Sequence, residues 1–435
     1  MKHVYATKML FALQLLALWL MPVLGGSQTA DPIGPVTGIL DQTLASGNLP
    51  AIIDNAGNNR GAGFNGTHVY VASRQNGNHV YYWDVTDPGN VGELDLTGVS
   101  GGTFVLSDLT VSGNHVLVSN MVFVGGTFRV YHWSDASAAP TVLLEYANAP
   151  ARLGDAISVI GDPDTSAKLV VSGHGSKNFY IWDIIGGNIP NTDPTVVTFD
   201  NVDNVNFARI TAAPGNDNLY IASGPVFRML LLDASFDVLD QVDGTFFQAW
   251  PMYLQAFELE GKRYLAYVHV SITPAENALH ILDISAGGGL QEAIQEMKNA
   301  SVSALLARNI PLGNVANGNA SASLDLVTDA SGEVWAMAYA AGNGLLVEKY
   351  GGTPPPQPVD PLSPVDTVLE ASAAAGTLPA IIDNAGNNRG AGFNGTHVYV
   401  ASRQNGNHVY YWDVNDAAAG PSELDLTGVT GGTFT

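Results

Sequence analysis

The strongest constraint on the fold of this chain is that the chain repeats itself. Residues 49–85 read LPAIIDNAGNNRGAGFNGTHVYVASRQNGNHVYYWDV, and the same 37 letters return at 378–414. The match resumes at 93–104 and 423–434, after a shift of one residue. A Pro-rich segment separates the copies, and such segments are typical of extended spacers between domains. We therefore expect a complete module at 36–350, a linker at 351–366 and an incomplete second module at 367–435.

A shorter repeat inside the first module indicates its architecture. Strand-like segments end in Asp at positions separated by 51, 48, 50 and 50 residues: Asp84, Asp135, Asp183, Asp233 and Asp283. A sixth segment ends at Tyr350 after a longer step, which includes a predicted short helix at 290–298. Within each unit, apolar and polar residues alternate as in half-buried strands, and Asn-Gly pairs supply hairpin turns.

Several antiparallel strands per unit, repeated about six times, are typical of a β-propeller, because one blade cannot bury both of its faces alone. The sequence therefore predicts an all-β, six-bladed propeller followed by a truncated second copy. Seven blades remain the alternative, because residues 36–53 contribute one more strand, either extra or closing.

Composition excludes several classes of function. The chain has no Cys, which excludes disulfide scaffolds and thiolate chemistry. It has 17 basic and 40 acidic residues and a net charge of −23, which argues against binding of nucleic acid.

The N-terminal segment is predicted to direct secretion. Residues 1–27 have the pattern of a secretory signal peptide: Lys2 and Lys8, then an apolar run at 9–24, then small residues at 25–27. The alternative is a membrane anchor, for which a run of this length is short. No later stretch is long and apolar enough to cross a bilayer, so we expect no membrane span after cleavage.

Two short segments carry a resemblance to known proteins. YWDVTDPGNV at 82–91 and IWDI at 181–184 resemble the strand ends of LVIVD-type secreted propellers, which read Val-x-Asp-Val-Ser-Asp-Pro. The whole module is also similar to secreted bacterial domains of unknown function that often occur in tandem. The resemblance implies a bacterial protein, secreted or at the cell surface, that binds a partner. It implies no established chemistry.

The axis of the predicted propeller is the place where a ligand site is expected. Polar residues at or near the starts of the innermost strands would converge there, and they are Arg60, Asp108, Arg152, Asp155, Arg209, Gln255 and Asp325. Arg in a concave site suits carboxylate or sulfate groups, whereas Arg–Asp pairs can also close a channel by satisfying one another. For Trp83, Trp133 and Trp182, their recurrence in successive units favours packing between blades over stacking on sugars.

Metal binding and catalysis have weak signals. Oxygen-rich clusters at 54–59, 162–164 and 200–204 make calcium the one candidate cofactor, although none has the spacing of a known calcium loop. His68 and His115 occupy equivalent places in two units and are interpreted as structural. The GxSxG pattern at 98–102 runs into a predicted strand, so we interpret it as a turn and not as a nucleophile elbow.

These observations predict a non-catalytic binding or adhesion module built from tandem propellers, with an extracellular polysaccharide or a surface protein as its partner. The alternative is an extracellular polysaccharide hydrolase or lyase with its active site at the funnel of the propeller. A structural spacer that only projects other domains is the third reading. No catalytic signature supports an enzyme.

Overall fold

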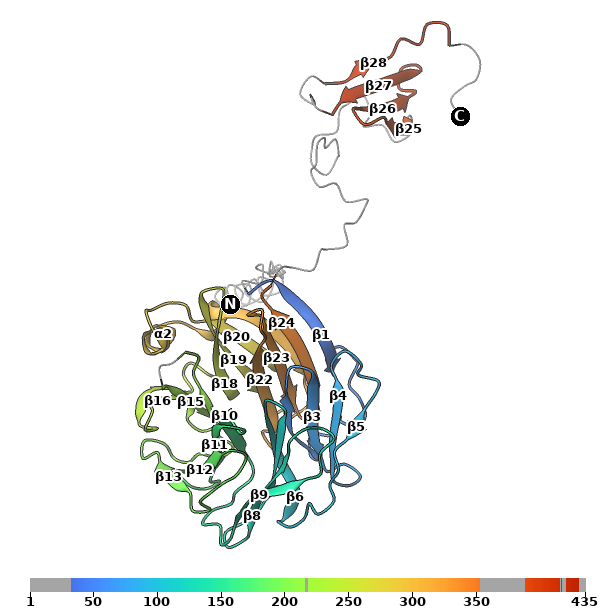
Figure 1. Ribbon diagram of the computed structural model, residues 1–435. Coiled ribbons are helices and arrows are strands. Elements are labelled where there is room, and N and C mark those ends of the chain that lie inside the picture. The colour runs from blue at the N-terminus through green and yellow to red at the C-terminus, as the bar shows by residue number, and fades with distance from the viewer. Residues whose placement is uncertain (1–32, 216–217, 353–387, 415, 417–419, 430–435) are drawn as a thin grey trace, which may run out of the picture. The chain divides into compact units, whose positions relative to one another are not determined.

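The computed structural model describes residues 33–352, apart from 216–217, and residues 388–429, apart from 415 and 417–419 (Figure 1). The predicted signal peptide and nearly all of the predicted linker lie outside the described residues. The chain divides into two compact units, Met1–Pro354 and Pro355–Thr435. In the described parts, no helix combines the length and the apolar character that crossing a membrane requires.

Six four-stranded antiparallel sheets make up the described part of the first unit, and we number them 1 to 6 along the chain. Sheet 1 contains β2 (Asn59–Phe64), β3 (His68–Ser73), β4 (His79–Asp84) and β5 (Gly92–Glu93). Sheet 2 contains β6 (Phe104–Ser112), β7 (His115–Met121), β8 (Phe128–Trp133) and β9 (Thr141–Tyr146). Sheet 3 contains β10 (Ile157–Asp162), β11 (Ser166–Ser172), β12 (Asn178–Ile185) and β13 (Thr195–Thr198).

The second half of the unit continues the pattern. Sheet 4 contains β14 (Arg209–Ala212), β15 (Tyr220–Gly224), β16 (Arg228–Leu232) and β17 (Val238–Val242). Sheet 5 contains β18 (Trp250–Leu259), β19 (Lys262–Val270), β20 (Asn277–Asp283) and β21 (Leu306–Gly313). Sheet 6 contains β22 (Ala322–Thr328), β23 (Val334–Ala340), β24 (Gly344–Tyr350) and β1 (Val36–Thr43).

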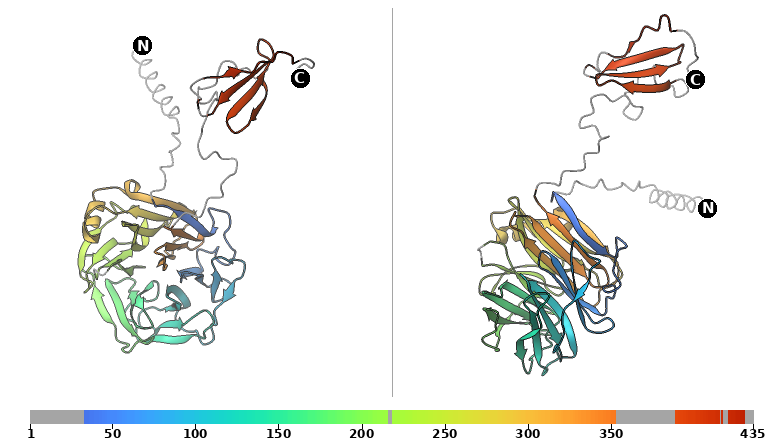
Figure 2. Two further views of the ribbon diagram at one scale, coloured as in Figure 1. Left: turned by 45° about the horizontal axis from the view of Figure 1, so that its top comes forward. Right: turned by 45° about the vertical axis from the view of Figure 1, so that its right-hand side comes forward.

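The sheets form a closed ring. The first strand of each sheet contacts the first strand of the next, and β22 of sheet 6 contacts β2 of sheet 1, so these six strands surround a common axis (Figure 2). The N-terminal strand β1 pairs with β24 and becomes the outer strand of sheet 6. The additional strand predicted at 36–53 therefore closes the last sheet and adds no further sheet among the described residues.

In most units, the Asp that ends the sequence repeat caps the turn after its strand. Oδ1 of Asp84 accepts hydrogen bonds from the backbone N (2.7 Å) and the Oγ1 (2.6 Å) of Thr86. Oδ1 of Asp135 accepts the same pair from Ser137. These hydrogen bonds lower the pKa of both carboxyl groups. Asp233 and Asp283 also accept a backbone N–H two residues later, whereas Asp183 pairs with Lys168 and its strand continues to Ile185. At four of the five positions the periodic Asp thus offers the backbone an alternative partner where the strand ends.

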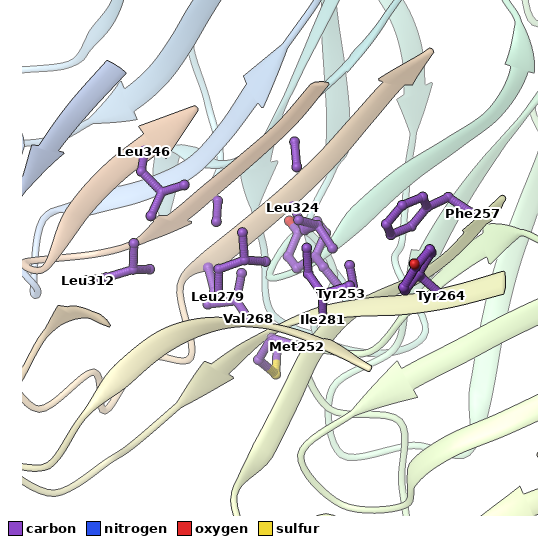
Figure 3. Close-up of a cluster of buried hydrophobic side chains, with 14 of the residues drawn as sticks. Met252, Tyr253, Phe257, Tyr264, Val268, Leu279, Ile281, Leu312, Leu324 and Leu346 are labelled. Atoms are coloured by element: carbon purple, nitrogen blue, oxygen red, sulfur yellow. The ribbon is translucent and has the colours of Figure 1, made fainter. Parts of the chain in front are cut away.

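The hydrophobic core consists of wedges between neighbouring sheets. Buried side chains form a separate cluster at every junction of the ring, from sheets 1 and 2 round to sheets 6 and 1. Figure 3 shows the cluster between sheets 5 and 6, where Met252, Ile281 and Leu324 meet. Because every sheet is covered on both faces by its neighbours, the ring buries apolar surface that no single sheet could bury.

Large aromatic side chains fill three of these junctions. Trp83, Trp133 and Trp182 are at most 1% exposed, and they lie in the clusters between sheets 6 and 1, 1 and 2, and 2 and 3. The indole N–H groups of Trp133 and Trp182 donate to the carbonyls of Asp95 and Thr192, each at 2.8 Å. The predicted packing role of the three tryptophans is confirmed.

Two short helices interrupt sheet 5. The helix predicted at 290–298 is present as α2 (Leu290–Met297), and α3 (Val302–Leu305) follows it. Leu290, Ile294 and Met297 of α2 join the cluster between sheets 4 and 5.

The described part of the second unit is one sheet, which we call the C-terminal sheet. It contains β25 (Asn388–Phe393), β26 (His397–Ser402), β27 (His408–Asp413) and β28 (Ser422–Glu423). Its register repeats that of sheet 1: Tyr399 pairs with Tyr411 as Tyr70 pairs with Tyr82. The repeated sequence therefore encodes the same strand pairing in both units.

Candidate functional site

A cavity of 560 Å³ opens where sheets 1, 2 and 3 present the ends of their inner strands. We call it the mouth cavity. Its lining includes three arginines, one carboxylate and one exposed aromatic ring: Arg60, Arg74, Arg152, Asp155 and Phe104. A cavity lined by three cations and one anion is unusual on a chain whose net charge is −23.

Arg74 follows the last residue of β3 and has the least satisfied guanidinium of the three. Its Nη2 lies 3.4 Å from the carbonyl of Gly57, and its Cζ lies 4.0 Å from the centre of the Phe104 ring. Its Nε and Nη1 are buried and have no hydrogen-bond partner among the described residues. Burial, and then the charge of Arg60, lower the pKa of Arg74 to about 10. The unpaired donors and the burial of the charge both disfavour this arrangement, and an anion in the cavity would offset both effects.

Arg152 lies in the loop before β10 and is held on one side only. Its Nη2 makes an ion pair with Oδ1 of Asp155 at 2.6 Å, whereas its buried Nε has no hydrogen-bond partner in the described part of the chain. Nδ1 of His174 lies 3.5 Å from Oδ2 of the same carboxylate. Burial lowers the pKa of His174 below its ordinary value, and the charge of Arg152 adds to this effect. Asp155 therefore positions Arg152 through Nη2, and Nε is left without an acceptor among the residues that the structure describes.

Arg60, on β2, forms the inner wall of the mouth cavity. It is 5% exposed, and its Nε donates to the carbonyl of Ser107 at 3.2 Å. Burial lowers the pKa of Arg60, and the carboxylates of Asp155 and Asp108 oppose that shift. Arg60 thus lies between the open cavity and a second group of charges deeper in the ring.

The deeper group is centred on an ion pair between the inner strands of sheets 2 and 4. Nη2 of Arg209 and Oδ2 of Asp108 form an ion pair at 2.6 Å, and both side chains are almost fully buried. The same carboxylate oxygen accepts the backbone N–H of Ile157 at 2.7 Å, and the guanidinium donates to the carbonyl of Ile157. Cζ of Arg209 also lies 3.5 Å from the centre of the Tyr253 ring. Burial raises the pKa of Asp108 to about 6, against the lowering effect of Arg209.

Asp325 and Gln255 connect the inner strands of sheets 5, 6 and 1. Oδ2 of Asp325, on β22, accepts the backbone N–H of Phe64, on β2, at 2.8 Å. Nε2 of Gln255, on β18, donates to the carbonyl of Leu324 at 2.7 Å. Burial raises the pKa of Asp325 to about 7. Both side chains are half-buried, and each forms a hydrogen bond with a backbone group of a neighbouring sheet.

The structure thus separates the seven predicted site residues into two groups. One group lines the mouth cavity: Arg60, Arg152 and Asp155. The other group lies deeper, around the axis: Asp108 and Arg209, which are buried, and Gln255 and Asp325, which are half-buried. Sequence reasoning missed Arg74, because it follows the second strand of its sheet and the prediction considered only the starts of first strands. Its recurrence as Arg403 in the second copy was no guide, since the whole segment recurs.

The remaining sequence signals have structural explanations. Ser100 of the GxSxG pattern lies between β5 and β6, with no helix after it, and Tyr131 donates to its carbonyl. Oδ1 of Asn55 caps its own turn at Gly57 and Asn58. The pattern at 98–102 is therefore a turn, as predicted, and 54–59 forms hydrogen bonds within a loop.

With this geometry in view, comparison with known proteins identifies the family. The sequence pattern of the family described as "Domain of unknown function (DUF4623)" matches residues 40–346. The chain belongs to the DUF4623 family. No curated protein matches it.

Solved structures extend the comparison to the fold. A DUF4623 family protein from Bacteroides eggerthii is 20% identical, with 73% of this chain and 76% of that chain covered and a TM-score of 0.64. A PQQ-bound aldose sugar dehydrogenase from Streptomyces coelicolor is 13% identical over 73% of this chain and 98% of that chain, with a TM-score of 0.38. A subtype N10 neuraminidase-like protein of a little yellow-shouldered bat virus strain is 8% identical over 73% and 98%, with a TM-score of 0.43. At 20% identity, the likeness to the Bacteroides eggerthii protein concerns the fold alone, which in this chain is an all-β ring of four-stranded sheets.

Proposed function

We propose that this DUF4623 protein is a secreted or cell-surface, non-catalytic binding module, in which each of sheets 1 to 6 is one blade of a six-bladed propeller. Its ligand is an acidic group, a carboxylate or sulfate carried by an extracellular polysaccharide or a surface protein, and it binds in the mouth cavity. The predicted signal peptide and the LVIVD-like strand ends support the extracellular setting.

One observation carries the proposal: Arg74 and Arg152 line the mouth cavity, and each has at least one buried guanidinium nitrogen with no hydrogen-bond partner among the described residues. Leaving a buried donor unpaired costs about 1–3 kcal/mol, more for a charged group. An anion that accepts from these nitrogens removes the cost, and the planar guanidinium suits carboxylate and sulfate oxygens.

Aromatic rings at the rim support a sugar as the carrier of the acidic group. Phe104 is 43% exposed and Phe123 is 54% exposed, and each lies beside one of the arginines. Exposed rings next to guanidinium groups offer apolar stacking and charge recognition together, as a uronic acid or a sulfated sugar requires.

The hydrolase or lyase alternative receives less support from this geometry. Glycoside hydrolysis commonly uses two carboxylates on either side of the scissile bond. The described lining of the mouth cavity includes one carboxylate, Asp155, and Arg152 holds it. Asp108 and Asp325 lie deeper, around the axis, and each accepts a hydrogen bond from a backbone N–H group.

A binding experiment tests the proposal with a control that the chain itself provides. The full chain is titrated with a polyuronate, a sulfated polysaccharide and a neutral polysaccharide by affinity electrophoresis and calorimetry. We expect binding to the acidic polymers that weakens with salt. The Arg74→Gln variant should bind at least about tenfold more weakly, since a charge-assisted hydrogen bond contributes about 1.5–3 kcal/mol.

Arg403→Gln is the matched control, because Arg403 has the same neighbours in sequence as Arg74. It should bind as the unmodified chain does. Equal binding of neutral and acidic polymers, or equal losses in the two variants, would contradict the proposed site. Hydrolysis of any polymer during the titration would restore the enzymatic alternative.

A further inference from the structure

A histidine and two aspartates from different sheets meet at the junction of sheets 2 and 3. His115 is the first residue of β7, Asp162 is the last residue of β10, and Asp164 lies in the turn after β10. Each offers one ligand atom, and these atoms all lie within 4.8 Å of one another. Nε2 of His115 and Oδ2 of Asp164 are 3.1 Å apart. In the described parts of the chain, this is the only such group of three.

The imidazole of His115 is positioned from behind by a second histidine. Its Nδ1 lies 2.7 Å from Nε2 of His132, on β8, and the two rings stack with their centres 5.0 Å apart. His115 is 7% exposed, so its orientation is fixed and its Nε2 faces the carboxylates. Histidines that bind metals commonly hold their other ring nitrogen in this way, which fixes the tautomer and the ring plane.

The turn that carries the carboxylates is held against sheet 2. Oγ of Ser112, at the end of β6, donates to the carbonyl of Gly161 at 2.9 Å. Within the turn, the backbone N of Asp164 donates to Oδ1 of Asp162 at 2.9 Å. The backbone positions of the two aspartates are therefore set, and their exposed side chains need only rotate to converge on a cation.

The equivalent junction between sheets 1 and 2 lacks the second histidine and the carboxylates. His68 begins β3 as His115 begins β7, but Tyr82 takes the place of His132. The facing turn there contains Asn114, whose Oδ1 accepts from Asn65 at 3.4 Å, and it contains no carboxylate. The histidine at this position recurs for packing, whereas the acidic turn and the second histidine occur at one junction.

We propose that His115, Asp162 and Asp164 bind a divalent transition-metal cation of the zinc class, which ties sheet 2 to sheet 3. Two carboxylates balance the charge of the cation, and one imidazole with two oxygens suits zinc better than calcium, which takes six to eight oxygens. Metal–ligand distances near 2.1 Å place tetrahedral ligands about 3.4 Å apart, and Nε2 and Oδ2 are 3.1 Å apart here. The cation takes the place of the proton on Nε2, and Nδ1 then donates to His132.

Calorimetry on the full chain tests the site after the chain has been stripped with EDTA and dialysed. We expect one saturable zinc site, with calcium at least about 100-fold weaker because the donor set includes imidazole. The variant with both Asp162→Asn and Asp164→Asn should bind zinc at least about tenfold more weakly, because neutral amides replace two anionic ligands. His132→Phe should weaken zinc binding by about tenfold, as the loss of a supporting hydrogen bond does elsewhere.

Asp193→Asn is the matched control, because Asp193 is another exposed turn aspartate followed by Pro. It should bind zinc as the unmodified chain does. Zinc should also raise the melting temperature of the unmodified chain and of this control, but not that of the double variant. Absence of a one-to-one site, equal affinity in the double variant and the control, or tighter binding of calcium than of zinc would each overturn the proposal. The site is independent of the mouth cavity, so polysaccharide binding does not enter the test.

Discussion

Residues 49–85 and 378–414 have the same sequence, yet they differ in what surrounds their strands. Both form the same hairpins with the same register. Phe64 is 2% exposed in sheet 1, whereas its counterpart Phe393 is 63% exposed in the C-terminal sheet. The residues of β3 after His68 are all buried, whereas most of β26 is only half-buried.

The comparison separates the structure that neighbouring residues determine from the burial that the ring of sheets adds. Strand pairing and turns depend on neighbours along the chain, and they appear in both copies. Burial of the sheet faces depends on sheets 2 and 6, which flank sheet 1 in the ring. Substitutions at paired positions of the two copies can therefore measure the contribution of the ring directly.

The largest difference is expected at Gly61 and its counterpart Gly390. A Cβ on Gly61 would lie 2.3 Å from the backbone N of Leu109 and from Oδ1 of Asp108, so the inner strands of sheets 1 and 2 approach too closely for a side chain. A Cβ on Gly390 would meet nothing within 4 Å. Gly61→Ala should destabilise the first unit by about 3 kcal/mol, since overpacking forces backbone shifts.

Differential scanning calorimetry of the full chain measures this effect, and Gly390→Ala is the control. The melting transition of the first unit should fall in Gly61→Ala and stay within about 1 °C in Gly390→Ala, because an open surface position contributes little. Similar shifts in the two variants would mean that the inner strands do not pack as the ring requires.

The local parts of this fold could be predicted from the sequence, and the parts made by the ring could be predicted only in outline. Alternation and Asn-Gly turns predicted the strands, and the periodic Asp predicted their ends. Arg60 and Arg152 were placed at the mouth, but Arg209 was not distinguished from them, because its partner Asp108 lies in another sheet. His115 was interpreted as structural because its pattern matches His68, while the carboxylates that face it are 47 and 49 residues away in sequence. Contacts between sheets depend on which side chains two distant turns bring together. The sequence of a single strand does not indicate these contacts.

The pH dependence of stability gives a second way to measure what the ring contributes, because titratable side chains lie around its axis. Asp325 accepts the backbone N–H of Phe64, so it is part of what surrounds sheet 1. Burial raises its pKa from 3.8 to about 7. A raised pKa in the folded state means that the folded protein binds more protons than the unfolded chain between these values. This contribution to stability is fully present below about pH 4 and is lost as the pH rises through about 7.

The melting temperature of the first unit should therefore rise by a few degrees when the pH falls from about 7.5 to about 5.5, since about 1 kcal/mol shifts it by roughly 2 °C in a unit of this size. At still lower pH the trend should reverse, because Asp84 and Asp135 have lowered pKa values and lose their turn caps when they are protonated. Asp325→Asn keeps an acceptor for Phe64 and should remove most of the rise. An unchanged rise in Asp325→Asn would assign the effect to another group, such as Asp108.

The smallest expected effect is a loss of stability that should be equal in the two copies. It tests whether the hairpin turns depend only on residues close in sequence. Gly77 and Gly406 both have φ of +143°, in the turns that join β3 to β4 and β26 to β27. In each copy, a Cβ would lie 2.9 Å from Nε2 of the histidine two residues later, His79 or His408. An alanine at either glycine should cost about 1 kcal/mol, because the φ value and not the ring opposes it. Amide hydrogen exchange of the two hairpins reports the cost locally, and the protection lost should agree between the copies within about twofold. A loss confined to Gly77→Ala would show that contacts within the ring also determine this turn. The turn would then count as ring-dependent structure and not as structure encoded by neighbouring residues alone.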